Sequence, residues 1–360
     1  MISQAERTLI YLSMNEIQNK KQELLLECFA DLEEFTVDNV VRNRNGILSG
    51  EEVMKLARGY DAGKLNSEIS NMLSNKIKIL TVLSENYPKS LLSLPSDRPL
   101  VLYAKGDLSL LNEQCFAIVG TRYPSNYGKM VTEKFAKKLA ESGLVIVSGL
   151  CFGVDEIAHR GALAVDGKTI AIIASGFGHI YPATNTALSH EIAEKGLLLS
   201  EYPPSFIAKK YTFPRRNRIV AGVSEGILIT EAGLKSGTVH TKEFALEYGK
   251  DVFVVPGNIT SSKSELTNQM LAQRQADCAL SPEYILEYYG LEGKAKEKKA
   301  VSVSIDEQLI LNLLADEEHD FDFLAQNSKI PVNILNSCLT TLEIRGLIRK
   351  LPAQMYARIC

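Results

Sequence analysis

The sequence lacks the features that mark membrane, secreted and metal-binding proteins. No segment approaches ~18 uninterrupted apolar residues, and the amino terminus has no basic stretch followed by an apolar run. The 6 cysteines are scattered, without a CxxC pair or a histidine at metal-ligand spacing, so neither zinc nor a disulfide framework is indicated. We therefore expect a soluble cytoplasmic protein with reduced thiols, no bound metal and no membrane insertion.

The composition is that of a folded globular protein. The 360 residues predict two or three domains. Hydrophobic residues make up 45% and charged residues 23%, which allows a sizeable core and excludes bulk disorder. The formal net charge is only -3, so a local excess of positive charge is informative.

Residues 81–290 alternate short apolar runs with amphipathic stretches, a pattern typical of a parallel sheet with crossover helices. The strands we predict are 116–120, 144–148, 169–174, 197–201, 226–230 and 252–255, with 101–104 as a further one. The helices we predict between them are 127–141, 154–165, 185–194 and 238–248. This order predicts an α/β fold with a doubly wound, mostly parallel sheet that binds ligands outside the carboxyl ends of its strands.

Two smaller regions flank the predicted sheet. Residues 1–80 have apolar positions three and four apart and predict a helical domain. Residues 291–304 are lysine-rich and suit a flexible linker. Residues 305–360 predict a winged-helix-like domain, whose third helix, 332–344, has almost no Lys or Arg. Because phosphate contacts dominate affinity for DNA, we expect this last domain to contact protein rather than duplex DNA.

The segment from Tyr211 to Ala221, YTFPRRNRIVA, carries the densest positive charge in the chain. With the residues just before it, it supplies five cations and an asparagine: Lys209, Lys210, Arg215, Arg216, Asn217 and Arg218. We interpret it as a loop on the α/β scaffold, a position where binding residues accumulate. Such a run suggests a phosphate-bearing partner, although a solvated basic surface would look the same.

Three predicted strand ends could receive an anion. The first ends in Gly120, followed by Arg122; the second ends in Ser148 and Gly149 before a helix. Ser236 and Gly237 open a third helix in the same way. Glycine permits close backbone approach, and a helix start favours negative charge.

Several other polar residues have two interpretations. Asp155 is more simply a helix-start stabiliser than a general base. Glu201 and Glu231 could perform acid and base chemistry, but we favour a role in holding the neighbouring arginines. Tyr181 and Tyr211 could stack on bases, although core tyrosines are commoner.

Taken in order, these motifs resemble the DNA-processing protein A family, also called DprA or Smf. The similar segments include AIVGTRYPSNYG, IVSGLCFGVDEIAH, FPRRNRIVAGVSEGILITEA and SGTVHTKEFALEYGKDVFVVPGN, over roughly 200 residues. The resemblance implies an extended Rossmann-like domain that binds single-stranded DNA, protects incoming DNA and loads the RecA recombinase in natural transformation. It further implies a homodimer, no known catalysis and no cofactor.

Carried over by motif, the resemblance assigns anion binding to Gly120, Arg122, Ser148, Gly149, Lys210, Arg216, Asn217, Ser236 and Gly237. The sequence also departs from the family pattern. Ala183 stands where some members have lysine, and Cys151 where a smaller residue is usual. Glu265 stands where a glycine is typical, and Arg274-Gln275-Ala276 stands where a Gly-Ala pair normally follows the next helix, which puts the geometry of residues 261–268 in question but not the fold.

An enzyme is the alternative. Rossmann-like hydrolases that cleave nucleoside monophosphates hold a phosphate at similar strand ends, but their PGGxGTxxE loop corresponds here only to EAGLKSGTVHTKE. The glycine pair is missing and Glu243 falls at a different offset. We also considered a transcription regulator, which the acidic character of the last domain disfavours.

Overall fold

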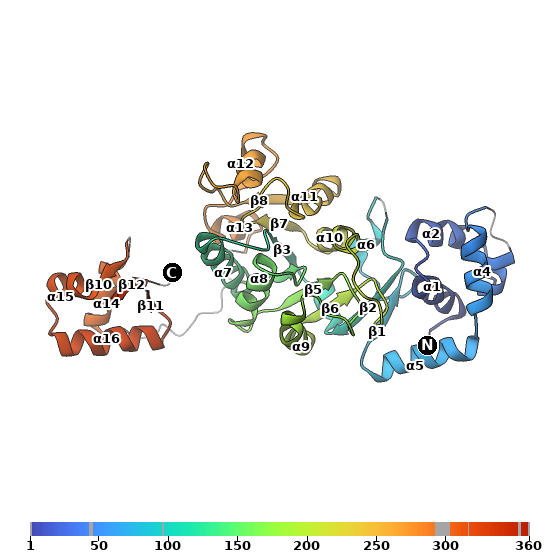
Figure 1. Ribbon diagram of the computed structural model, residues 1–360, viewed down its shortest axis with the longest axis horizontal. Coiled ribbons are helices and arrows are strands. Elements are labelled where there is room, and N and C mark those ends of the chain that lie inside the picture. The colour runs from blue at the N-terminus through green and yellow to red at the C-terminus, as the bar shows by residue number, and fades with distance from the viewer. Residues whose placement is uncertain are drawn as a thin grey trace. The chain divides into compact units, whose positions relative to one another are not determined.

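The computed structural model describes residues 2–42, 46–95, 97–291, 303–315, 317–351 and 354–358. It divides into two compact units, residues 1–295 and 296–360 (Figure 1). Most of the predicted linker, 291–304, lies outside the described residues.

The first unit contains a nine-stranded sheet in the order β1-β2-β6-β5-β4-β3-β7-β8-β9. Pairing is parallel from β6 to β9 and antiparallel between β1, β2 and β6, which confirms the mostly parallel sheet. The strands are β1 Lys78–Thr81, β2 Val101–Gly106, β3 Cys115–Val119, β4 Val145–Ser148, β5 Thr169–Ile173, β6 Leu197–Ser200, β7 Gly226–Ile229, β8 Asp251–Val254 and β9 Asp277–Cys278.

Both faces of this sheet are covered. On β3, Phe116 and Ile118 pack on one face, and Ala117 and Val119 on the other. The first face is covered by α7 Asn126–Glu141, α8 Val154–Leu163, α9 Thr186–Lys195 and α13 Pro282–Tyr288. The second is covered by α6 Lys89–Leu92, α10 Thr212–Val223, α11 Thr238–Glu247 and α12 Glu265–Ala272. Strands buried on both faces explain the near-continuous apolar runs in the sequence.

The strand order reverses at β3. The chain builds outward through β4, β5 and β6, and β7 then returns to the opposite side of β3. In open α/β sheets such a switch point leaves a crevice outside the carboxyl ends of the strands. The loops after β3, β4 and β7 therefore meet there.

The basic segment is a helix rather than the expected loop. Helix α10 spans Thr212–Val223, and Pro214 lies in its first turn, where proline is tolerated because no intrahelical N–H bond is needed. Ile219 and Val220 are buried against the sheet. Tertiary packing of this apolar end stabilises the helix. The run of arginines before it made the helical spacing of the apolar residues hard to recognise in the sequence.

The amino-terminal region is helical, as expected. Its helices are α1 Gln4–Met14, α2 Asn19–Glu27, α3 Val37–Arg42, α4 Gly50–Gly59 and α5 Ala62–Ser74. Their core includes Val101 and Tyr103 of β2, so these helices pack on the antiparallel end of the sheet. The domain boundary at residue 80 stays a prediction, because the compact unit runs through it.

In its described residues, the second unit has three helices and a three-stranded sheet in the order β10-β12-β11. Its elements are α14 Ile305–Leu313, β10 His319–Asp320, α15 Phe321–Ser328, α16 Val332–Ile344, β11 Ile348–Lys350 and β12 Met355–Arg358. Helix α16 coincides with the expected third helix. Across the parts of the chain that are described, no helix is both long and apolar enough to span a bilayer.

Candidate nucleic-acid interface

A pocket of about 1120 Å³ lies at the switch point. It is bounded by the loops after β3, β4 and β7, by α10, and by the segment that leads into α12. Of the residues predicted to bind an anion, it brings together Gly120, Arg122, Gly149, Lys210, Arg216, Asn217, Ser236 and Gly237. The remaining four, Ser148, Lys209, Arg215 and Arg218, do not line it.

Arg216 ties α10 to the turn after β4. Its Nη1 donates to the carbonyl oxygens of Gly149 and Ile172, and its Nη2 lies 3.5 Å from the Cys151 sulfur. The side chain is 3% exposed, yet it forms part of the pocket wall. A Cβ at position 149 would overlap the guanidinium. Glycine at 149 therefore allows the arginine to lie against the backbone.

Asn217 joins α10 to the start of α11. Its Oδ1 accepts from Arg216 Nε at 3.1 Å, and its Nδ2 donates to the Gly237 carbonyl at 3.3 Å. The amide thus holds both the arginine and the helix-opening loop beside the pocket. An asparagine suits this position because its side chain both accepts and donates a hydrogen bond.

The loop after β3 packs directly on the start of α8. Gly153 has φ +76°, and a Cβ there would lie 2.6 Å from the carbonyl oxygens of Thr121 and Arg122. Only glycine adopts this conformation without strain at such a close approach. Val154 N donates to the Thr121 oxygen at 3.2 Å, which fixes the loop that carries Arg122.

The pocket lining also contains two cations, Lys235 and Lys263, that were not predicted from the sequence as binding residues. They line the pocket together with Arg122 and Lys210, and none of these four forms an ion pair within the described residues. Each missed lysine stands alone in the sequence, so charge clustering could not find it. Both lysines lie in the loops that follow β7 and β8, and this placement was the available signal.

Aromatic rings line one side of the pocket. Arg122 lies over the Phe213 ring at 5.4 Å, and Tyr181 meets the same ring edge-on at 5.4 Å. Tyr181 is half exposed and lines the pocket, whereas Tyr211 is exposed outside it. A stacking role for either tyrosine stays a prediction.

Asp155 lies in the first turn of α8, beside the pocket. Burial raises the pKa of its carboxyl, and the Arg216 guanidinium opposes that rise. Its Oδ2 accepts from Cys151 N at 3.3 Å, which is the contact expected of a helix-start stabiliser. Burial likewise raises the pKa of the Cys151 thiol, so the thiol is not activated as a nucleophile.

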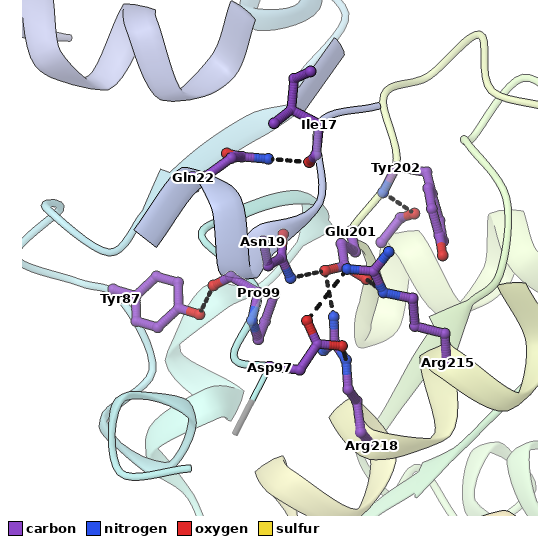
Figure 2. Close-up of polar contacts among 11 residues, drawn as sticks. Ile17, Asn19, Gln22, Tyr87, Asp97, Pro99, Glu201, Tyr202, Arg215 and Arg218 are labelled. Carbon is purple, nitrogen blue, oxygen red and sulfur yellow. Dashed lines mark hydrogen bonds and ion pairs between the residues drawn. The ribbon is translucent and has the colours of Figure 1, made fainter. Parts of the chain in front are cut away.

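Three of the predicted site cations are held by carboxylates elsewhere, which corrects the expectation that all five face one ligand. Arg218 is 1% exposed and is paired with Glu201 and Asp97 (Figure 2). Arg215 Nη2 lies 3.3 Å from Asp97 Oδ1, and Lys209 Nζ lies 2.7 Å from Glu16 Oε2. Residues three apart share one side of a helix, so Arg215 and Arg218 face away from Arg216.

The predictions for Glu201, Glu231 and Ser148 have different outcomes. Glu201 does hold arginines, as favoured from the sequence. Glu231 does not: its carboxylate accepts from Ser125 N at 2.8 Å and Ser125 Oγ at 2.6 Å. Ser148 is buried and donates to the Ile118 carbonyl at 2.7 Å, so its hydroxyl is used inside the sheet.

The segment with the unusual Glu265 is well defined. Asn268 exchanges two 3.1 Å hydrogen bonds with the backbone of Gly257, and Glu265 opens α12 at the pocket wall. Glu265 therefore contributes a carboxylate to the pocket lining. Within the described ranges, no group of His, Cys, Asp and Glu side chains is arranged to hold a metal.

These features define a Rossmann-like α/β protein with a pocket at the switch point that is lined by cations, followed by a winged-helix unit. The family model for DNA recombination-mediator protein A matches residues 78–290, and that for the DprA winged helix domain matches residues 294–354. The chain belongs to the DprA/Smf family of DNA-processing proteins.

Individual relatives agree with this assignment. DNA processing protein DprA of Bacillus subtilis is 44% identical over 184 residues, which cover 51% of this chain and 62% of that protein. Protein Smf of Escherichia coli is 37% identical over 286 residues, which cover 77% of this chain and 76% of that protein.

Two solved structures share the fold. The DprA structure from Streptococcus pneumoniae superposes with a TM-score of 0.71 at 34% identity and covers 79% of this chain and 98% of its own. DNA processing protein A of Helicobacter pylori, described for its single-stranded DNA binding mode, gives a TM-score of 0.55 at 37% identity. It covers 59% of this chain and 95% of its own.

Proposed function

We propose that this protein binds single-stranded DNA in the switch-point pocket, protects incoming DNA and loads the RecA recombinase during natural transformation. The observation that carries the proposal is the convergence of Arg122, Lys210, Lys235 and Lys263 on one pocket. These side chains approach from four separate segments, so a phosphate backbone passing through the pocket would meet them in turn. The solved Helicobacter pylori relative, described as a single-stranded DNA binder, supports the same assignment.

The pocket chemistry suits a backbone rather than a base sequence. Cations and backbone amides grip phosphates without reading bases, and exposed rings such as Tyr181 offer stacking that any base can use. Affinity should therefore depend weakly on sequence. Duplex DNA, whose bases are not free to stack, should bind less tightly.

Salt dependence tests this proposal. If three or four phosphates are neutralised, log affinity should fall with log salt at a slope of about -2 to -3, at ~0.7 per phosphate for single strands. Fluorescence anisotropy with a labelled oligonucleotide at several salt concentrations measures that slope. A salt-independent affinity, or equal affinity for blunt duplex, would overturn the proposal.

No catalytic step is part of the proposed function. Two carboxylates near the pocket have hydrogen-bond donors as partners: Asp155 accepts from the Cys151 amide, and Glu231 accepts from Ser125. Incubation with nucleoside monophosphates tests the alternative, hydrolase function. Released free base, detected by chromatography and lost in an Asp155→Asn variant, would replace the binding proposal with an enzymatic one.

Homodimerisation and cytoplasmic action complete the proposal and rest on family membership. Sedimentation at several protein concentrations tests the dimer. Assembly of RecA on single-stranded DNA coated with a single-strand binding protein tests loading: this protein should shorten the lag. An unchanged lag would remove RecA loading while leaving DNA binding in place.

A further inference from the structure

The turn between α1 and α2 reaches the basic segment, although 193 positions separate Glu16 from Lys209. The Lys209 ammonium lies 2.7 Å from Glu16 Oε2. A few residues later, Asn19 Nδ2 donates to Glu201 Oε1 at 2.5 Å. The amino-terminal helices therefore contact both the start of the basic segment and the carboxylate that anchors its arginines.

Glu201 is the centre of a larger polar cluster. Figure 2 shows the side chains of Asn19, Asp97, Arg215 and Arg218 meeting around it. Arg218 Nε lies 3.0 Å from Asp97 Oδ2, and Arg215 Nε lies 3.9 Å from Glu201 Oε2. Two guanidinium groups thus face two carboxylates, and the local charge is balanced.

This cluster holds the side of α10 that faces away from the pocket. Arg215 and Arg218 stand in the sequence on either side of Arg216 and Asn217, which belong to the pocket wall. Because a helix is stiff, fixing the direction of residues 215 and 218 also fixes the direction of residues 216 and 217. The start of the same segment, Lys210, follows directly after the residue paired with Glu16.

The cluster is poorly arranged for stability alone. Among the described residues, the buried atoms Glu201 Oε2, Arg215 Nε and Arg218 Nη1 have no hydrogen-bond partner. A buried ionic cluster with open donors and acceptors adds little net stability compared with apolar side chains of similar size. A role in setting the position of α10 accounts for its presence better than a role in stability.

We propose that Glu16, Asn19, Asp97 and Glu201 form a clamp that positions helix α10, so that the amino-terminal helical region sets the affinity of the pocket for single-stranded DNA. These are positioning residues, because they act through Lys209, Arg215 and Arg218. The inference rests on the proposed function for its DNA readout. It assigns a role to the amino-terminal helices that does not require them to contact DNA.

The Glu16→Lys variant separates a clamp from a simple charge effect. It replaces a negative charge near the basic segment with a positive one, so a purely electrostatic role predicts tighter binding of single-stranded DNA. The clamp predicts weaker binding by about 5-fold or more, because Lys209 would be repelled from its anchor. Tighter binding would overturn the clamp.

The charge swap completes the test. Lys209→Glu alone should weaken binding, and the double variant Glu16→Lys with Lys209→Glu should recover to within about 2-fold of the wild type, because the pair is restored in reverse. If Lys209 contacts phosphate directly, the double variant will remain as weak as Lys209→Glu alone. That outcome would overturn the clamp at this contact.

A matched control lies on the same helix as Asn19. Lys21 forms a 2.7 Å ion pair with Glu52 inside the amino-terminal region. Lys21→Ala should leave DNA affinity unchanged, whereas Asn19→Ala should weaken it by about 5-fold. If the two substitutions weaken DNA binding equally, the cause is a general loss of folding, and the clamp is overturned. If neither weakens it, the clamp is overturned as well.

Amide hydrogen exchange without DNA keeps the two proposals distinguishable. Exchange of residues 209–218 should be faster in Glu16→Lys and Asn19→Ala than in the wild type and Lys21→Ala. Unchanged exchange in the two clamp variants would overturn the clamp whatever the DNA result. If the wild type fails to bind single-stranded DNA but exchange responds as expected, the proposed function falls, and only the positioning of α10 by the clamp residues stands.

Discussion

The guanidinium of Arg216 is bonded to the backbone carbonyl of Gly149, so the basic helix is fastened to the turn after β4. A side chain at position 149 would overlap that guanidinium. We expect Gly149→Ala to destabilise the fold by about 1–3 kcal/mol, as overpacking does, and to weaken binding of single-stranded DNA. Chemical denaturation and anisotropy measure the two effects.

Gly237→Ala is the matched control, because Gly237 lines the same pocket and a Cβ there would meet nothing within 4 Å. Its stability should stay within about 0.5 kcal/mol of the wild type. Equal destabilisation by both substitutions would show that the Gly149–Arg216 contact has no special role.

The central strands of the sheet could be predicted because each is buried on both faces and is therefore an apolar run, whereas the partly exposed edge strands β1 and β9 were not predicted. The predicted strand 116–120 became Cys115–Val119, and the predicted helix 332–344 became α16 without a shift. The prediction of a loop at the basic segment was wrong, because α10 has Pro214 and three arginines at positions where a helix normally shows an apolar pattern. Its buried end, Ile219 and Val220, was the overlooked signal.

The site was only partly predictable for a physical reason. Strand ends located Gly120, Gly149 and Gly237, because parallel strands finish at one edge. The sequence could not separate Arg216 from Arg218, since that requires the rotational phase of α10 and the position of Asp97, more than 100 residues earlier. Distant partners of this kind appear only in the folded chain.

Lys210 is the clearest test of a direct phosphate contact. It is exposed and lines the pocket. Lys210→Ala should weaken binding about equally for all sequences and reduce the magnitude of the salt slope by ~0.7. Lys134→Ala, on an exposed position of α7 outside the pocket, should change neither quantity. An unchanged salt slope in Lys210→Ala would show that the bound DNA strand does not contact Lys210.

Arg218 should matter for stability far more than Lys209. Arg218→Ala leaves Glu201 buried without its main partner and should cost about 3–5 kcal/mol in the free energy of unfolding. Lys209→Ala removes a half-exposed pair and should cost less than about 1 kcal/mol. Urea unfolding compares the two. If the two substitutions lower the free energy of unfolding by similar amounts, water reaches Arg218 more than its 1% exposure implies.

His159 predicts a specific sensitivity to acid. Burial, helped by Arg216, lowers the pKa of His159 to about 3 from 6.5. The folded state therefore keeps the neutral ring, and the unfolded state takes up a proton as the pH falls below about 6.5. Stability is unaffected by this group above that pH and should fall by about 2 kcal/mol between pH 7 and pH 5.

The His159→Asn variant should be less stable at pH 7, because the hydrogen bond between Nδ1 and Thr169 Oγ1, 2.7 Å in length, is altered. Its stability should nevertheless fall less steeply between pH 7 and pH 5, since the titrating group is gone. Urea midpoints at several pH values measure both slopes. Parallel slopes for the variant and the wild type would assign the acid sensitivity to other groups.

Arg274 offers a stabilising substitution, because its backbone conformation is one that arginine rarely adopts. It follows the end of α12 with φ +55°, a left-handed conformation that glycine adopts freely and arginine does not. Its side chain is exposed, so little packing is lost on removal. Arg274→Gly should therefore stabilise the protein by about 1 kcal/mol, visible as a higher urea midpoint. Arg274→Ala keeps the strained backbone and should give no such gain; if it stabilises the protein equally, the backbone conformation is not the cause.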